Sequence, residues 1–181
     1  MKKLITMVLG IAMLCGSAMA DEAAVSNSNE DTQEVAQSNT VKYAISPVVN
    51  YATFDDLDSE TGFGVKGSAE NVFAENIVLS TGVSLYNLNN SDLYRIPVTV
   101  GYNVKLNELV TVTPKVGADV NILDKDNDDT VNSVGFTGGA DLSVKISENN
   151  KLFAGVSYSA DTINGTNLDG FTYTGGVAIG F

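Results

Sequence analysis

Six charged residues have the types and positions to act together in this 181-residue chain. Each lies in a segment where apolar and polar residues alternate, and each occupies the polar parity of its segment: Lys66, Arg95, Lys115, Asp119, Asp141 and Lys145. Alternate residues of a strand share one face. If the strands enclose an interior, we expect Asp119 and Asp141 to neutralise neighbouring cations of this set, because buried charges must pair or reach water.

The residue types give little support to catalysis. The chain has no histidine, the side chain that most often transfers protons near neutral pH. No group of serine, lysine and acid at the spacing of an activated nucleophile stands out from the many Ser and Thr residues. We therefore predict that the protein is not an enzyme and needs no cofactor.

A run of alternating acids, Asp124, Asp126 and Asp128, resembles the start of a calcium-binding loop. Such loops also require a glycine at the sixth position and a glutamate at the twelfth, where this chain has Gly135. The run is a weak metal candidate, and we predict a solvated hairpin tip that binds no metal.

From Val41 onward, apolar residues recur at every second position, the period of a β-strand. Eight such segments can be separated: residues 41–51, 62–69, 77–85, 94–105, 110–122, 133–146, 151–159 and 170–181. Most reach the roughly 9 to 11 residues that a tilted strand needs to cross a membrane. Two residues depart from the pattern. Pro47 lies on an apolar parity and predicts a bulge or strained pairing, and Phe153 lies on a polar parity.

The aromatic residues and the connections indicate how the strands are oriented. Nine aromatics fall near strand ends, six at one end and three at the other: Tyr51, Phe63, Tyr94, Phe136, Tyr158 and Phe171, then Tyr43, Tyr102 and Phe181. They predict aromatic girdles at two membrane interfaces. Connections 54–61, 87–92, 123–130 and 161–169 are polar, whereas 70–76, 106–108 and 147–150 are shorter or more apolar. We expect the first set outside the cell and the second in the periplasm.

The N-terminus predicts export. Lys2 and Lys3 precede an apolar run that ends at Leu14, and small residues up to Ala20 form a signal-peptidase site. Residues 1–20 are therefore predicted to be a signal peptide, cleaved before Asp21. Cys15 leaves with it, although a lipoprotein is an alternative that bulky Leu14 disfavours. Residues 21–40 carry five acids and no Lys or Arg, and we expect a flexible periplasmic leader before a barrel domain at 41–181.

The charge of the chain limits the classes of partner that it can bind. The formal net charge is −12, and removal of the two lysines of the signal, with no acids, makes it −14. No cluster of basic residues is present, so we exclude nucleic acid as a partner.

The last strand closes with a pattern similar to the C-terminal assembly signal of bacterial outer-membrane proteins, carried by Tyr173, Gly175, Ile179 and Phe181. With the strand count, the alternation and the aromatic positions, residues 41–181 resemble the small eight-stranded outer-membrane barrels, including the OmpA transmembrane domain, OmpX and the opacity-type proteins. The resemblance implies an all-β, antiparallel, up-and-down transmembrane barrel in the outer membrane, inserted by the barrel assembly machinery. It also implies a non-enzymatic role in envelope structure, adhesion or defence, with a surface ligand that the sequence does not identify.

Alternatives from other classes stay open at this point. The charges inside the barrel either form a polar plug or line a narrow, porin-like ion path with Arg95 as the gate. A soluble periplasmic barrel of lipocalin type would bind a small apolar ligand and turn its apolar parity inward. The expected neighbours of a membrane barrel are outer-membrane lipids and lipopolysaccharide, whose phosphates divalent ions could bridge to the acidic tips at 55–60 and 124–129.

Overall fold

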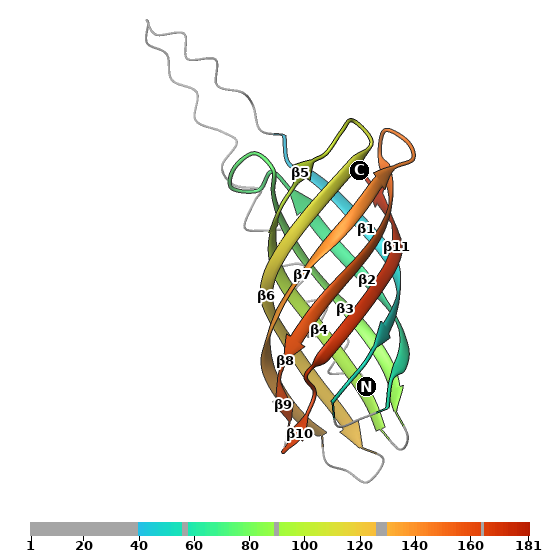
Figure 1. Ribbon diagram of the computed structural model, residues 1–181, viewed down its shortest axis with the longest axis vertical. Helices are drawn as coiled ribbons and strands as arrows, with labels where there is room; N and C mark the ends of the chain where they lie inside the picture. Colours follow the sequence, from blue (N-terminus) through green and yellow to red (C-terminus); the bar gives the residue numbers. More distant parts are fainter. Residues whose placement is uncertain (1–39, 56–57, 89–90, 126–129, 164) are drawn as a thin grey trace, which may run out of the picture. The chain divides into compact units, whose positions relative to one another are not determined.

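The computed structural model describes residues 40–55, 58–88, 91–125, 130–163 and 165–181, which form one closed β-barrel (Figure 1). Eight long strands build the wall: β1 (Lys42–Ala52), β2 (Glu60–Glu70), β3 (Ile77–Leu88), β4 (Ser91–Tyr102), β6 (Val110–Lys125), β7 (Thr130–Lys145), β8 (Asn150–Ala160) and β11 (Gly170–Gly180). Three two-residue strands add β5 (Val104–Lys105) beside β6, and a small pair of β9 (Thr162–Ile163) with β10 (Thr166–Asn167). No helix in the described ranges is long and apolar enough to cross a membrane.

Every pairing between the long strands is antiparallel, and each long strand pairs with its neighbours in the sequence. The barrel closes because β11 pairs with β1. The predicted eight-stranded up-and-down barrel is therefore confirmed. Several strands extend further than predicted at the end that carries the polar loops, because residues such as Asn87 and Asp92 remain paired where the alternation has already stopped.

The two ends of the barrel differ in the connections that they carry. The loop end carries the connections at 53–59, 89–90, 126–129 and 161–169, and the terminal end carries the start of β1, the end of β11 and the turns at 71–76, 106–109 and 146–149.

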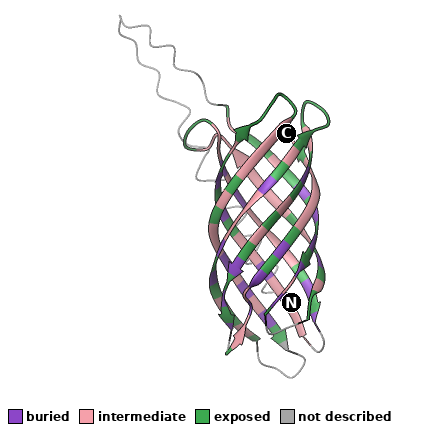
Figure 2. Cartoon of the chain, in the orientation of Figure 1, coloured by how far each residue is buried: buried purple, intermediate pink, exposed green. Residues whose placement is uncertain are grey.

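Burial alternates along much of the barrel wall, as the banding in Figure 2 shows. On β1, Ser46 and Asn50 are buried, whereas Ile45, Val49 and Tyr51 are exposed. The polar parity thus faces the lumen and the apolar parity faces outward. This is the reverse of the packing that a lipocalin-type barrel requires, so that alternative does not fit the structure.

Glycines on the inward parity let neighbouring strands approach closely. A Cβ atom on Gly117 would lie 2.0 Å from the carbonyl oxygen of Val98 on the adjacent strand. The outward Gly67, in contrast, would place a Cβ no nearer than 3.9 Å to the atoms around it. The inward glycines are therefore a steric requirement of this narrow, strongly curved barrel.

Pro47 does not produce the predicted bulge. The β1–β2 register continues through the pair of Pro47 with Val65. On the other side, Ile45 pairs with Ile179 and Val48 with Gly176 in one unchanged register, and only the two pairs between them are missing from the ladder. Because proline has no N–H to donate, the ladder is interrupted there without an inserted residue.

The final residue joins the end of β11 to the start of β1. The Phe181 N–H donates to the carbonyl oxygen of Tyr43 at 3.0 Å, and the two rings stack with their centroids 6.3 Å apart. These two contacts hold the first and last strands together at the terminal end.

Candidate functional site

A group of three charged side chains meets in the lumen, in the half nearer the terminal end. Asp141 on β7 accepts a hydrogen bond from Lys66 Nζ of β2 at 2.7 Å and from Lys115 Nζ of β6 at 2.6 Å. These side chains are 22% (Lys66), 14% (Lys115) and 10% (Asp141) exposed. Gly155 on β8 provides the space, since a Cβ there would lie 2.0 Å from Asp141 Oδ1. We call Lys66, Asp141 and Lys115 the lysine group.

Phe153, the aromatic residue on a polar parity, lies inside the barrel beside the lysine group. Its side chain is buried, and Lys66 Nζ lies 4.9 Å from the centroid of its ring. A cation over an aromatic face is electrostatically favoured, which gives this inward aromatic a role in a polar lumen.

Arg95 on β4 lies nearer the loop end and is almost fully buried. Its Nε donates to Asn121 Oδ1 at 2.9 Å and its Nη1 to Thr172 Oγ1 at 3.1 Å. Asp119 Oδ2 lies 4.0 Å from Arg95 Nε and accepts a hydrogen bond from Ser159 Oγ at 2.6 Å. Arg95 Nη2 is buried without a hydrogen-bond partner among the described residues.

Two other features of the lumen charges differ from what the sequence suggested. Lys145 is exposed at the terminal end, because it is the last residue of β7, and the structure does not place it near the lysine group. An ion pair that the sequence reasoning missed joins Lys151 Nζ to Glu70 Oε1 at 2.5 Å across the terminal mouth. Lys151 lies on the polar parity of β8, so the signal was present.

Asp161 is a further buried carboxylate that the sequence reasoning missed. It accepts hydrogen bonds from Asn121 Nδ2 at 2.7 Å and from Ser133 Oγ. Asn121 therefore links Arg95 to Asp161. The residue continues the polar parity of β8 by one step, but the sequence assigned it to a loop.

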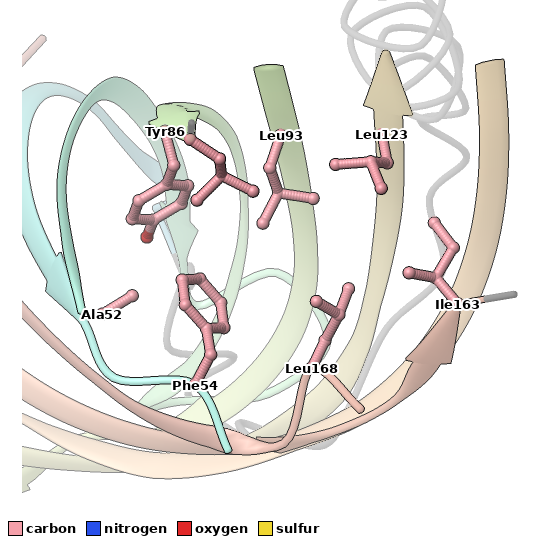
Figure 3. Close-up of a cluster of buried hydrophobic side chains, with 8 residues drawn as sticks. Ala52, Phe54, Tyr86, Leu93, Leu123, Ile163 and Leu168 are labelled. Carbon is pink, nitrogen blue, oxygen red and sulfur yellow. The ribbon is translucent and has the colours of Figure 1, made fainter. Parts of the chain in front are cut away.

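Apolar side chains fill the lumen at the loop end. Eight buried residues form this cluster: Ala52, Phe54, Tyr86, Leu88, Leu93, Leu123, Ile163 and Leu168. Figure 3 shows that the labelled members point toward one another across the barrel. We call these eight residues the apolar plug. Most of them occupy the inward parity at strand ends, and that position was the signal that could have identified them.

The connections at the loop end bring three members of the apolar plug into the lumen. Asp55 N donates to the carbonyl oxygen of Asp169 at 2.9 Å, and Leu168 N donates to that of Asp161 at 2.9 Å. Phe54 meets the Tyr86 ring edge-on at 6.0 Å and lies 5.4 Å from the Arg95 guanidinium. The plug thus rests directly on the buried arginine, and the described lumen is filled at this end.

The structure describes one of the three acids of the weak metal candidate. Asp124 is exposed and accepts a hydrogen bond from Thr130 Oγ1 at 3.3 Å, whereas Asp126 and Asp128 lie outside the described residues. Within the described ranges, no group of three or more His, Cys, Asp or Glu side chains could hold a metal ion.

The nine girdle aromatics all lie on the outward parity, and all except the partly exposed Tyr94 are exposed. Near the loop end, the Tyr158 and Phe171 rings meet edge-on at 5.1 Å. Three residues of the proposed assembly signal, Tyr173, Ile179 and Phe181, are exposed on the outer face, and a Cβ on Gly175 would meet nothing within 4 Å. Their part in assembly stays a prediction.

Comparison with known proteins decides the family. The model of the outer membrane protein beta-barrel domain matches residues 7–181. The chain belongs to this family. An outer-membrane β-barrel of this kind lies in the bacterial outer membrane, among its lipids. The signal peptide at 1–20 and the leader at 21–40 stay predictions, since residues 1–39 are outside the described ranges.

Solved barrels share the fold of this outer-membrane β-barrel. Neisserial surface protein A matches with a TM-score of 0.62 at 18% identity, covering 78% of this chain and 97% of that chain. The N-terminal barrel of Pseudomonas aeruginosa OprF matches at 0.58 and 13% identity, covering 77% and 97%. The attachment invasion locus protein Ail of Yersinia pestis matches at 0.55 and 18% identity, covering 78% and 97%. No curated protein matches by sequence.

Proposed function

We propose that this outer-membrane barrel is a non-enzymatic envelope protein that interacts with other surfaces through its acidic loop end. The observation that carries the proposal is the apolar plug, because eight buried side chains make the loop end a closed support for its loops. Recognition surfaces are commonly loops held on a rigid scaffold. An ion path would have to cross the plug, and Arg95, the predicted gate, lies immobilised beneath it.

The unequal distribution of charge supports a surface role. Segments 54–61, 87–92, 123–130 and 161–169 together hold eleven acidic residues, of which Asp161 is buried in the lumen, and one basic residue, Lys125. Such a face attracts cationic groups and divalent ions. We propose that it contacts cationic surfaces, and that divalent ions bridge it to lipopolysaccharide phosphates in the same leaflet.

The inner side chains support a non-enzymatic role. The buried serine Ser159 donates to Asp119, and Ser133 donates to Asp161, with no histidine in the sequence to act as a base. These hydroxyls are held by carboxylates that in turn meet Arg95 or Asn121. Such an arrangement stabilises the barrel and offers no activated nucleophile.

The proposal requires the loop end to face outward, which cysteine labelling tests. If Cys15 leaves with the signal, the mature chain contains no other cysteine. In whole cells, a membrane-impermeant maleimide is expected to label Asp58→Cys in a loop, but not Glu148→Cys in a turn at the terminal end. The opposite labelling would refute the proposed orientation.

A binding experiment tests the role itself. Cells carrying Asp55→Asn, Asp58→Asn and Asp92→Asn together are expected to bind polylysine-coated beads less than wild-type cells do. The matched control removes the same number of acids at the other end, with Glu75→Gln, Glu108→Gln and Glu148→Gln, and should bind as the wild type does. Equal binding by all three strains would contradict the proposal.

A further inference from the structure

A cavity of about 70 Å³, lined by more polar than apolar residues, lies in the lumen beside the lysine group and Arg95. Hydroxyl groups line much of it, including those of Ser80, Thr99, Thr137 and Thr172. Room for one water needs roughly 10 to 15 Å³ by the same measure. The cavity therefore has space for a small ion with some water, but not for an organic molecule.

The charges around the cavity are unevenly paired. Three cations, Lys66, Lys115 and Arg95, belong to its lining, and Asp119 is the one acidic residue that does. Asp141 neutralises only one of the two ammonium groups that it binds. The other inner carboxylates lie on the Arg95 side of the lumen: Asp119 faces Arg95, and Asn121 links Asp161 to Arg95. Because Lys66 and Lys115 share one carboxylate, one ammonium charge beside the cavity is left without a direct counter-charge.

Donor hydrogens are also in excess at the cavity wall. An ammonium group has three N–H donors and no acceptor, and Lys66 and Lys115 each make one hydrogen bond among the described residues, both to Asp141. Arg95 adds the buried Nη2 without a partner. Burial of charge without compensation is costly, so a negative charge placed here would be stabilised.

We propose that the cavity binds a small monovalent inorganic anion of the halide class. The ammonium groups of Lys66 and Lys115 supply the charge. The hydroxyl of Ser80, which accepts a hydrogen bond from Thr99 Oγ1 at 3.5 Å, supplies a further donor. The ion enters from the terminal end, where the Lys66 side chain is 22% exposed, because the apolar plug fills the other end. Binding therefore requires no conduction through the barrel.

A chloride titration of the folded protein in detergent micelles tests the proposal. Sodium chloride replaces sodium gluconate at constant ionic strength, since gluconate is too large for a cavity of about 70 Å³. We expect saturable shifts of the amide resonances of Ser80, Thr99 and Thr137, with no comparable change at Asp55 or Asp58 in the loops. Absence of these shifts, or shifts that grow linearly without saturation, would overturn the proposal.

Matched lysine variants give a second readout. Lys66→Met leaves the lysine group with one ammonium and one carboxylate, so that its charges balance. This variant is expected to abolish the saturable shifts. Lys145→Met removes an exposed lysine of the same inward parity and should leave them unchanged. Identical chloride responses in the two variants would overturn the assignment. If Lys66→Met does not show the heat-modifiable gel mobility of a folded barrel, Lys115→Met replaces it with the same expected outcome.

Discussion

Replacement of Asp141 by asparagine removes the charge that Lys66 and Lys115 share. Asparagine keeps the shape of the side chain, but its amide offers one acceptor and turns a donor toward the second ammonium. The two hydrogen bonds measure 2.7 and 2.6 Å, and each bond to a charged group contributes about 1.5 to 3 kcal/mol. Because the ammonium groups keep partial access to water, we expect a loss of about 3 to 5 kcal/mol in the free energy of unfolding, as for other buried pairs that lose one partner.

Urea unfolding of the barrel in lipid vesicles, in gluconate buffer, measures this loss. Addition of Lys115→Met to Asp141→Asn should recover part of it, because one of the two uncompensated ammonium groups is removed. Glu70→Gln removes the charge that Glu70 offers to Lys151 in a partly exposed ion pair, in which the Lys151 side chain is 34% and the Glu70 side chain 25% exposed. This change should cost about 1 kcal/mol or less. If Asp141→Asn cost no more than Glu70→Gln, the reasoning about the lysine group would be refuted.

Further variants test the packing. Leu93→Ala should cost about 2 to 5 kcal/mol through the cavity left in the apolar plug, and an effect no larger than that of the outward Leu85→Ala would contradict the burial assigned to it. Gly117→Ala should cost about 1 to 3 kcal/mol, because its Cβ would meet the Val98 carbonyl. The outward Gly67→Ala should be nearly neutral, and equal urea midpoints for the two glycine variants would show that close strand approach is not the reason for the inward glycines.

The sequence predicted the barrel because one face of every long strand is apolar and outward, so the period of two remains visible without tertiary contacts. It was less informative at the loop end. There the inward parity becomes apolar at Tyr86, Leu88 and Leu93, and the alternation that marks a membrane strand fades although the ladder continues. Of the two outcomes predicted for Pro47, the bulge does not occur; the ladder loses two pairs beside the missing donor without an extra residue.

The lumen charges could be assigned to a face but not to partners. Parity places Lys66, Lys115 and Asp141 inward, whereas their meeting depends on strand stagger, which brings β2 opposite β7 at that height. The same stagger leaves Lys145 exposed at the terminal end. The segment that contains Ile163 and Leu168 showed no alternating pattern in the sequence. Its place in the apolar plug depends on the hydrogen bonds of the folded loop.

Single-channel recording in planar bilayers tests most directly the claim that the apolar plug closes the barrel. The folded wild-type protein is expected to insert without stepwise conductance. A double variant that opens the plug, Ile163→Gly with Leu168→Gly, is expected to give conductance steps. It serves as the positive control for insertion of the barrel into the bilayer. Steady conductance steps from the wild-type barrel, at the level of the double variant, would contradict a closed loop end.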